Sequence, residues 1–219
     1  MKPTVLFSEM TPGVDWEEQF NEWYDTEHIP IRMQVPGFCC ARRYKHVDAK
    51  GYLAVYEMEH RGVLQSEEYR MIKENPSELT KWMLQNVTGF TRYTGELISE
   101  QINQAFAGDP YDAPILYAVM FTVPEERESE FDEWYIQDHV PTLLKNPDWY
   151  ACRRYRIFSG EPENWTHLAL HYLANVNVLD CEERKEARNS PWRARLAQES
   201  WFKGRYTIYE KIKTFHAKV

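Results

Sequence analysis

Residues 20–30 read Phe-Asn-Glu-Trp-Tyr-Asp-Thr-Glu-His-Ile-Pro, and residues 131–141 read Phe-Asp-Glu-Trp-Tyr-Ile-Gln-Asp-His-Val-Pro, an offset of 111 residues. At the same offset Arg42–Tyr44 recurs as Arg153–Tyr155. A repeat this long indicates a duplicated domain and not a solenoid. Each copy has about 100 residues, which is an ordinary length for one domain.

Aromatic residues are abundant, with 8 Trp, 14 Tyr and 10 Phe. Such side chains line apolar ligand pockets, although they also fill cores and subunit interfaces. The net charge of −8 lacks the basic field of a nucleic-acid-binding protein. The basic residues of one segment are interleaved with acidic ones and are expected on a solvated helix face: Arg184, Lys185, Arg188, Arg193 and Arg195.

The four cysteines form no CxxC pair, so we expect neither a disulfide framework nor a zinc site. The first residues lack the apolar core of a signal peptide. No stretch approaches the roughly 20 apolar residues that a membrane span needs. We therefore expect a cytoplasmic protein with no membrane partner.

Hydrophobic periodicity and turn residues predict the order β-α-β-β-α-β in each copy. The first copy is expected to contain strands 4–10, 38–47, 52–59 and 89–98, a helix that ends near Pro30, and helical residues within 65–85. The second is expected to contain strands 115–122, 149–158, 166–173 and 205–214, helix 125–140, and helical pieces between 174 and 200. The predicted domains are residues 1–98 and 114–219, joined by a linker.

A unit of this order has helices on one face of its sheet, so the other face must be covered. Two copies in one chain can cover each other. We therefore predict an α+β fold in which two ferredoxin-like repeats form an intramolecular, pseudo-dimeric α+β barrel. Such a barrel leaves a cavity in or beside each half. The whole chain is expected to be a monomer or a homodimer.

The string F-x-E-W-Y-x-x-[ED]-H-[IV]-P, followed by R-R-Y on the next strand, resembles the EthD-like branch of the dimeric α+β barrel superfamily. The resemblance covers nearly the whole chain, twice. It implies a fold shared with small lactone isomerases, polyketide cyclases, cofactor-free monooxygenases and haem-binding chlorite dismutases. A shared fold does not fix the reaction.

His28 and His139 close the two motifs and are the first candidates for catalysis. Imidazole titrates near neutral pH, which suits general acid–base chemistry. A histidine at a helix C-terminus is also favoured by the helix dipole, so a purely structural role is the alternative.

The Arg-Arg-Tyr strands are the second candidates. Alternation along a strand places Phe38, Cys40, Arg42 and Tyr44 on one face, which we expect to face the barrel, with Arg153 and Tyr155 as the equivalents. There they can bind a carboxylate, phenolate or enolate. An internal salt bridge to a helix carboxylate is the alternative.

The third strand of each copy differs in chemistry. An offset of 115 residues aligns Tyr52 and Tyr56 with His167 and His171. We expect this polar and aromatic face to look into the barrel, and the leucine and valine face to pack on helices. His171 then joins His139 as a catalytic candidate, and Tyr56 joins the substrate-binding candidates, as does Trp134 of the second motif.

These residues predict a cofactor-independent lyase, isomerase or cyclase that acts on a small aromatic, lactone or enolisable substrate. The second half is favoured as the active one. No nucleotide-binding or metal-binding motif is present, so no cofactor and no metal are expected. Two alternatives stay open: a non-catalytic, stress-related module that binds a small ligand, and a haem- or oxygen-dependent oxidoreductase.

Overall fold

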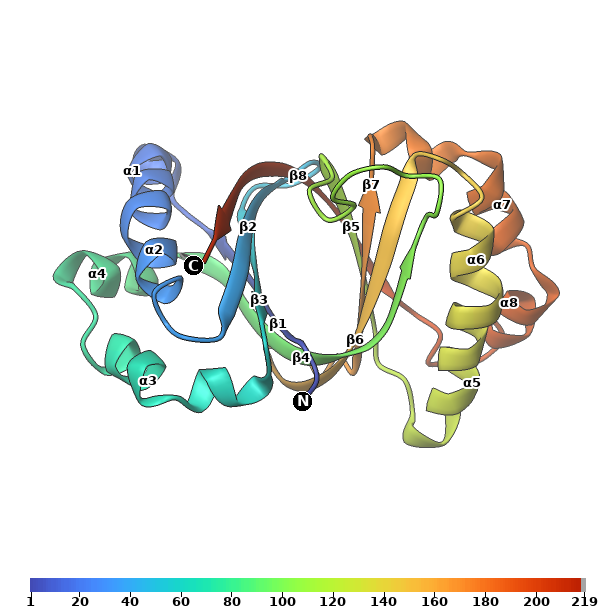
Figure 1. Cartoon of the computed structure of the whole chain (residues 1–219), viewed down its shortest axis with the longest axis horizontal. Coiled ribbons are helices and arrows are strands. Elements are labelled where there is room, and N and C mark those ends of the chain that lie inside the picture. The colour runs from blue at the N-terminus through green and yellow to red at the C-terminus, as the bar shows by residue number, and fades with distance from the viewer. Residues whose placement is uncertain (218–219) are drawn as a thin grey trace. The chain divides into compact units, whose positions relative to one another are not determined.

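The computed structural model describes residues 1–217. The first copy contains strands β1 (Thr4–Thr11), β2 (Phe38–His46), β3 (Tyr52–Met58) and β4 (Thr88–Ile102), with helices α1 (Glu17–Trp23), α2 (Ile29–Arg32), α3 (Glu67–Glu74) and α4 (Glu78–Asn86). The second contains strands β5 (Ile115–Phe121), β6 (Trp149–Glu161), β7 (His167–Leu173) and β8 (Arg205–His216), with helices α5 (Glu128–Trp134), α6 (Val140–Leu143), α7 (Glu182–Arg188) and α8 (Pro191–Leu196). The predicted order of elements is confirmed in each copy (Figure 1).

The chain forms two compact units. Unit 1 comprises residues 1–96 and 158–162 together with the chain from Ile212 onward, and unit 2 comprises residues 97–157 and 163–211. The units differ from the predicted domains because long strands pass from one unit into the other. The boundary lies inside β4, and the last residues of β6 and β8 belong to unit 1.

Both units have the same strand order. In unit 1, β1 pairs with β3 and β4, and β2 pairs with β3, all antiparallel. In unit 2, β5 pairs with β7 and β8, and β6 pairs with β7, again antiparallel. Followed through hydrogen-bonded neighbours, the strands run β1-β3-β2-β8-β5-β7-β6-β4 and return to β1, so the sheet is a closed, eight-stranded barrel.

A β-bulge near the start of β2 changes which residues share a face. The register shifts between Phe38 and Cys40, so Phe38 packs with Ala41 in the helix-facing core, and Arg42 and Tyr44 belong to the opposite face. The same shift occurs at the start of β6, where Trp149 joins the helix-facing core. Simple alternation from Phe38 was therefore wrong for the first residue of the strand.

The third strand faces the opposite way from the prediction. Tyr52 and Tyr56 pack against the aromatic side chains of α1 in the helix-facing core. The rings of Phe20 and Tyr52 are 5.5 Å apart. The expectation that this face looks into the barrel was wrong, because the aromatic stripe of the helix is large enough to need aromatic partners on the sheet.

Each copy has a π-helical turn between its first two α-helices. These turns span Tyr24–His28 and Tyr135–His139. The helix therefore continues past Pro30, which is the second residue of α2 and follows the π-turn directly. Single π-turns occur often at functional sites, and here both contain the candidate histidine.

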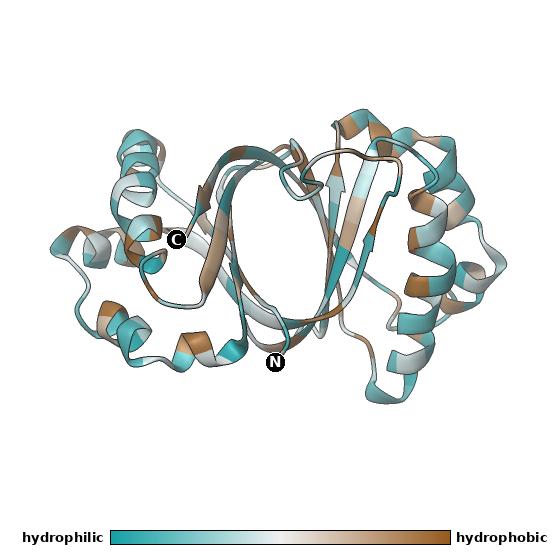
Figure 2. Ribbon diagram, in the orientation of Figure 1, coloured by the Kyte–Doolittle hydropathy of each residue, from teal (hydrophilic) through white to brown (hydrophobic). Residues whose placement is uncertain are grey.

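The helices mix hydrophilic and hydrophobic residues along their length (Figure 2). Within the described part of the chain, no helix is long and apolar enough to cross a membrane.

Candidate functional site

Unit 1 contains a cavity of about 650 Å³, the unit 1 cavity, between its helices and strands β1, β3 and β4. Its wall includes Tyr24, His28, Arg32, Tyr56, Tyr69 and Lys73. Apolar side chains such as Leu6, Met10 and Phe90 complete it. A space of this size, with an apolar wall and a few polar groups, has the character of a small-molecule site.

The π-turn places Tyr24 and His28 side by side in this wall. Their ring centres are 4.7 Å apart, and the centre of the Trp23 ring is 4.3 Å from that of His28. His28 is 5% exposed, and its Nδ1 is buried with no hydrogen-bond partner among the described residues. Contacts with these two tilted rings thus hold the imidazole while one of its nitrogens has no hydrogen-bond partner among the described residues.

Burial lowers the pKa of His28 well below its usual value, and the charges of Arg32 and Arg43 lower it further. Burial also raises the pKa values of Tyr24 and Tyr56, so both hydroxyls stay protonated. The Tyr56 hydroxyl affects the pKa of Tyr24 yet makes no hydrogen bond of ordinary geometry. At neutral pH the three groups are uncharged, so His28 lacks the titration near pH 7 that was expected of it.

The second arginine of each pair connects the sheet to a helical carboxylate, in the π-turn for Arg43 and in α5 for Arg154. Arg43 forms an ion pair with Asp25 at 2.6 Å, and Arg154 forms one with Asp132. The alternative role predicted for these strands, an internal salt bridge to a helical carboxylate, is therefore the one that these two arginines have.

The first arginines also have carboxylate partners. Arg42 pairs with Glu57, and Arg153 pairs with Glu100, each at 2.6 Å. These arginines, Tyr44 and Tyr155 line neither the cavity of unit 1 nor the smaller cavity of unit 2. They share the face opposite to the helices, and their contact with substrate stays a prediction.

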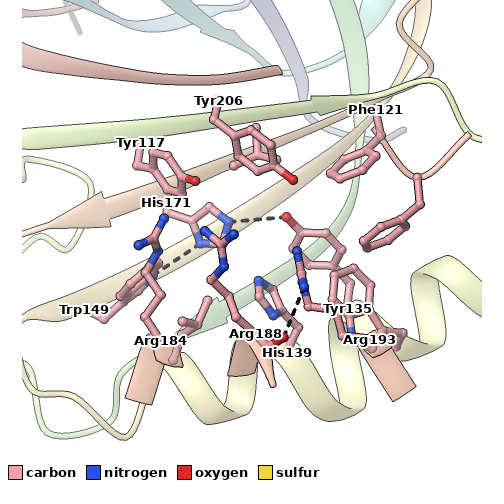
Figure 3. A pocket seen from close by; sticks show the side chains of 14 residues that line it. Tyr117, Phe121, Tyr135, His139, Trp149, His171, Arg184, Arg188, Arg193 and Tyr206 are labelled. Carbon is pink, nitrogen blue, oxygen red and sulfur yellow. Dashed lines mark hydrogen bonds between the residues drawn. The ribbon is translucent and has the colours of Figure 1, made fainter. Parts of the chain in front are cut away.

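Unit 2 has a much smaller cavity, of about 30 Å³, the unit 2 cavity. The predicted residues His139 and His171 line it, together with Tyr135 (Figure 3). The predicted residue Trp134 lines it as well. Burial lowers the pKa of His139 to about 3 and that of His171 well below its usual value. The two histidines are therefore brought together but stay neutral.

A hydrogen-bond chain fixes the tautomer of His171. The indole Nε1 of Trp149 donates to Nδ1 of His171 at 3.3 Å. The imidazole proton must then lie on Nε2, which is 3.5 Å from the Tyr135 hydroxyl (Figure 3). His171 is thus a donor to Tyr135 and no free base.

The basic cluster of α7 and α8 is divided between the cavity and the solvent. Arg184, Arg188 and Arg193 line the unit 2 cavity. Lys185 pairs instead with Glu182 at 2.6 Å, and Arg195 is exposed. The expectation of a solvated face was wrong for Arg184 and Arg193, which are half-buried, whereas Arg188 is exposed although it lines the cavity. The helical spacing of Arg184 and Arg188 indicates a shared face.

Sequence reasoning missed Tyr24 and Arg32 of the unit 1 cavity. Each lies four residues from His28, so helical spacing around the histidine was the available signal. Among residues 1–217, no three His, Cys, Asp or Glu side chains gather as metal ligands.

Comparisons with known proteins give a partial family match. The model of a domain of unknown function, DUF4286, matches residues 114–179. No curated protein matches the chain significantly.

Solved structures resemble the chain over nearly its whole length. An anthrone oxidase-like protein has 14% identity and a TM-score of 0.71, with coverage of 99% of this chain and 93% of its own. A candidate monooxygenase from Fusobacterium nucleatum has 9% identity and a TM-score of 0.65, covering 98% and 94%. Chlorite dismutase from Candidatus Nitrospira defluvii has 8% identity and a TM-score of 0.57, covering 96% and 91%. These likenesses confirm the dimeric α+β barrel fold and do not distinguish its EthD-like branch.

Haem is the cofactor of one of the alternatives that the sequence left open. A histidine that ligates a metal almost always donates its other ring N–H to an acceptor. In the described chain, Nδ1 of His28 and of His139 has no partner, and both nitrogens of His171 are engaged by Trp149 and Tyr135. The histidines of the two cavities therefore do not fit haem iron.

Proposed function

We propose that the protein is an oxidoreductase that uses dioxygen to oxidise a small phenol or enolisable ketone containing a ring. The reaction takes place in the unit 1 cavity. The observation that carries the proposal is the neutral group of His28, Tyr24 and Tyr56 in the wall of a cavity of about 650 Å³. The oxidase, monooxygenase and dismutase names of the structural neighbours support this class.

The cavity favours an anionic oxygen on the substrate. Tyr24 and Tyr56 keep their protons and can each donate a hydrogen bond to that oxygen. The positive charges of Arg32 and Arg43, which disfavour protonated His28, stabilise a phenolate or enolate for the same reason. His28 accepts the proton that the substrate loses, and its low pKa makes this transfer dependent on the bound anion being stabilised.

The electron-rich carbon of the anion then reacts with dioxygen. In the overall reaction, an activated CH₂ group loses two hydrogens and gains one oxygen atom as a carbonyl. The second oxygen atom leaves with those hydrogens as water. Dioxygen is the oxidant and the substrate supplies the electrons, so the balance needs no further reductant.

This proposal replaces the expected lyase, isomerase or cyclase. None of the structural neighbours named above is described as one, and the low pKa of His28 makes it a poor base for unaided proton abstraction. It also moves the preferred site from the second half to the first. A ring fits a space of about 650 Å³, whereas the unit 2 cavity of about 30 Å³ holds little more than water.

We also infer that the two units are tandem copies of one ancestral half and form a pseudo-dimer. The 111-residue offset and the identical strand order support this inference. The difference in volume between the unit 1 cavity and the unit 2 cavity supports divergence of the two copies after duplication.

Anthrone is a suitable probe substrate, since its CH₂ group lies between two aromatic rings and opposite the carbonyl of the same central ring, so that loss of a proton gives a phenolate. Oxygen uptake and quinone absorbance are recorded with metal-free protein, and a protein-free solution corrects for spontaneous oxidation. We expect one dioxygen consumed for each quinone formed. Binding of anthrone without oxygen uptake would support the ligand-binding alternative, and uptake that requires added haem would refute the cofactor-free reaction.

A further inference from the structure

The wall of the unit 2 cavity has cationic side chains and no anionic ones. Arg184 and Arg188 approach it from α7 and Arg193 from α8 (Figure 3). None of the three forms an ion pair with a carboxylate within residues 1–217, although one guanidinium nitrogen of Arg184 donates to the Leu179 carbonyl and one of Arg193 donates to the Arg188 carbonyl. No Asp or Glu lines this cavity, whereas Glu27 and Glu161 line that of unit 1. The positive charge here is therefore not neutralised by the protein.

Further donors lie among the aromatic residues of the same wall. Nε2–H of His171 points to the Tyr135 hydroxyl, which leaves the hydroxyl's own hydrogen available to a different acceptor. Trp134 is buried, and its indole N–H has no hydrogen-bond partner in the described chain. An indole can only donate, so it needs an acceptor. A buried donor without an acceptor is costly, which indicates that the cavity suits a ligand rich in acceptors.

The size of the cavity limits that ligand. A space of about 30 Å³ holds one or two waters or a small ion, and not a fused ring system. We propose that unit 2 binds a small oxyanion, with the chemistry shared by a carboxylate and inorganic phosphate, through Arg184, Arg188, Arg193 and Tyr135. Guanidinium forks match both oxyanions with paired hydrogen bonds. This binding is independent of the oxidation proposed for unit 1.

Thermal unfolding and calorimetric titration test the site with sodium acetate and sodium phosphate, and sodium chloride at equal ionic strength gives the baseline. We expect at least one oxyanion to raise the unfolding temperature with increasing concentration, beyond the chloride effect. Comparison of the acetate titration with the phosphate titration shows which oxyanion binds more tightly. Tyr135→Phe, which keeps the ring and removes the hydroxyl, should lower the affinity for the preferred anion.

Arg184→Gln and Arg193→Gln should each weaken binding about tenfold, since a charge-assisted hydrogen bond is lost. Arg195→Gln is the matched control, because Arg195 lies on α8 but is exposed outside the cavity. Equal affinity in all three variants, or no stabilisation beyond chloride, would overturn the proposal. Oxygen uptake with anthrone should be unchanged in Arg184→Gln, so failure of one proposal does not imply failure of the other.

Discussion

Arg43 of β2 and Asp25 of the π-turn form an ion pair, with 2.6 Å between Nη1 and Oδ1. The same guanidinium donates to Oδ1 of Asn21 at 2.6 Å and lies 4.7 Å from the centre of the Tyr24 ring. The Arg43 side chain is 1% exposed. These contacts hold the turn that contains Tyr24 and His28 against the sheet.

Arg43→Met should lower the free energy of unfolding by about 2–3 kcal/mol. Removing one partner of a buried pair is costly, and the partial exposure of Asp25 and its second ion pair, with Lys213 at 3.1 Å, moderate the cost. Urea unfolding measures the change. Arg70→Met is the control, because Arg70 forms exposed pairs with Glu67 and Glu74 that contribute little. Similar losses in both variants would show that the Arg43 contacts are not special.

His139 should make the protein sensitive to mild acid. Part of the residue is accessible to solvent, but Nδ1 is buried, and the pKa falls from 6.5 unfolded to about 3 folded. As the pH drops below 6.5, His139 therefore takes up a proton in the unfolded chain but not in the folded chain. The contribution of neutral His139 to the free energy of unfolding is complete above pH 6.5 and is lost as the pH falls from 6.5 to about 3.

His139→Gln should reduce the dependence of unfolding free energy on pH by up to about 1.4 kcal/mol per pH unit within that window. Urea unfolding at neutral pH and at about pH 5 measures this slope. His216→Gln, at an exposed residue near the end of β8, is the control. An unchanged slope in His139→Gln would mean that the histidine is charged in the folded protein.

Truncation after Lys211 should lower the unfolding temperature and cause self-association. The end of β8 belongs to unit 1, and the Ala217 N–H donates to the Cys39 carbonyl at 3.1 Å. Its removal leaves the edge of β2 unpaired, and such edges associate with other chains. Residues 1–100 alone should behave similarly, because they also lack residues 158–162. Light scattering after size exclusion measures association, with truncation after Ala217 as the control. A monomer of unchanged unfolding temperature would contradict this prediction.

The sequence allowed the element order to be predicted because strands and helices have distinct hydrophobic periods. It did not reveal which face of each sheet meets the helices. The bulge after Phe38 interrupts alternation, and Tyr52 packs against helical aromatics instead of facing the barrel. The candidate histidines were found from the repeat. Their neutral state was not, since burial by side chains distant in the chain sets each pKa.

The difference in volume between the two cavities could not be predicted from the sequence. Alignment places Tyr56 opposite His171, which indicated divergence but gave no volumes. In the structure, Arg184 of α7 and Arg193 of α8 approach the cavity that His171 of β7 also lines. Only tertiary packing brings them together.

Tyr56→Phe tests most directly whether the unit 1 cavity oxidises its substrate. The variant keeps the ring and removes one hydroxyl that is proposed to stabilise the substrate anion. Oxygen uptake with anthrone is compared with that of the wild type and of Tyr117→Phe, which alters the unit 2 cavity. We predict that kcat falls about a hundredfold in Tyr56→Phe, as for loss of one oxyanion donor, and stays near wild type in Tyr117→Phe. Unchanged uptake in Tyr56→Phe, or a larger loss in Tyr117→Phe, would contradict the assignment of the reaction to unit 1.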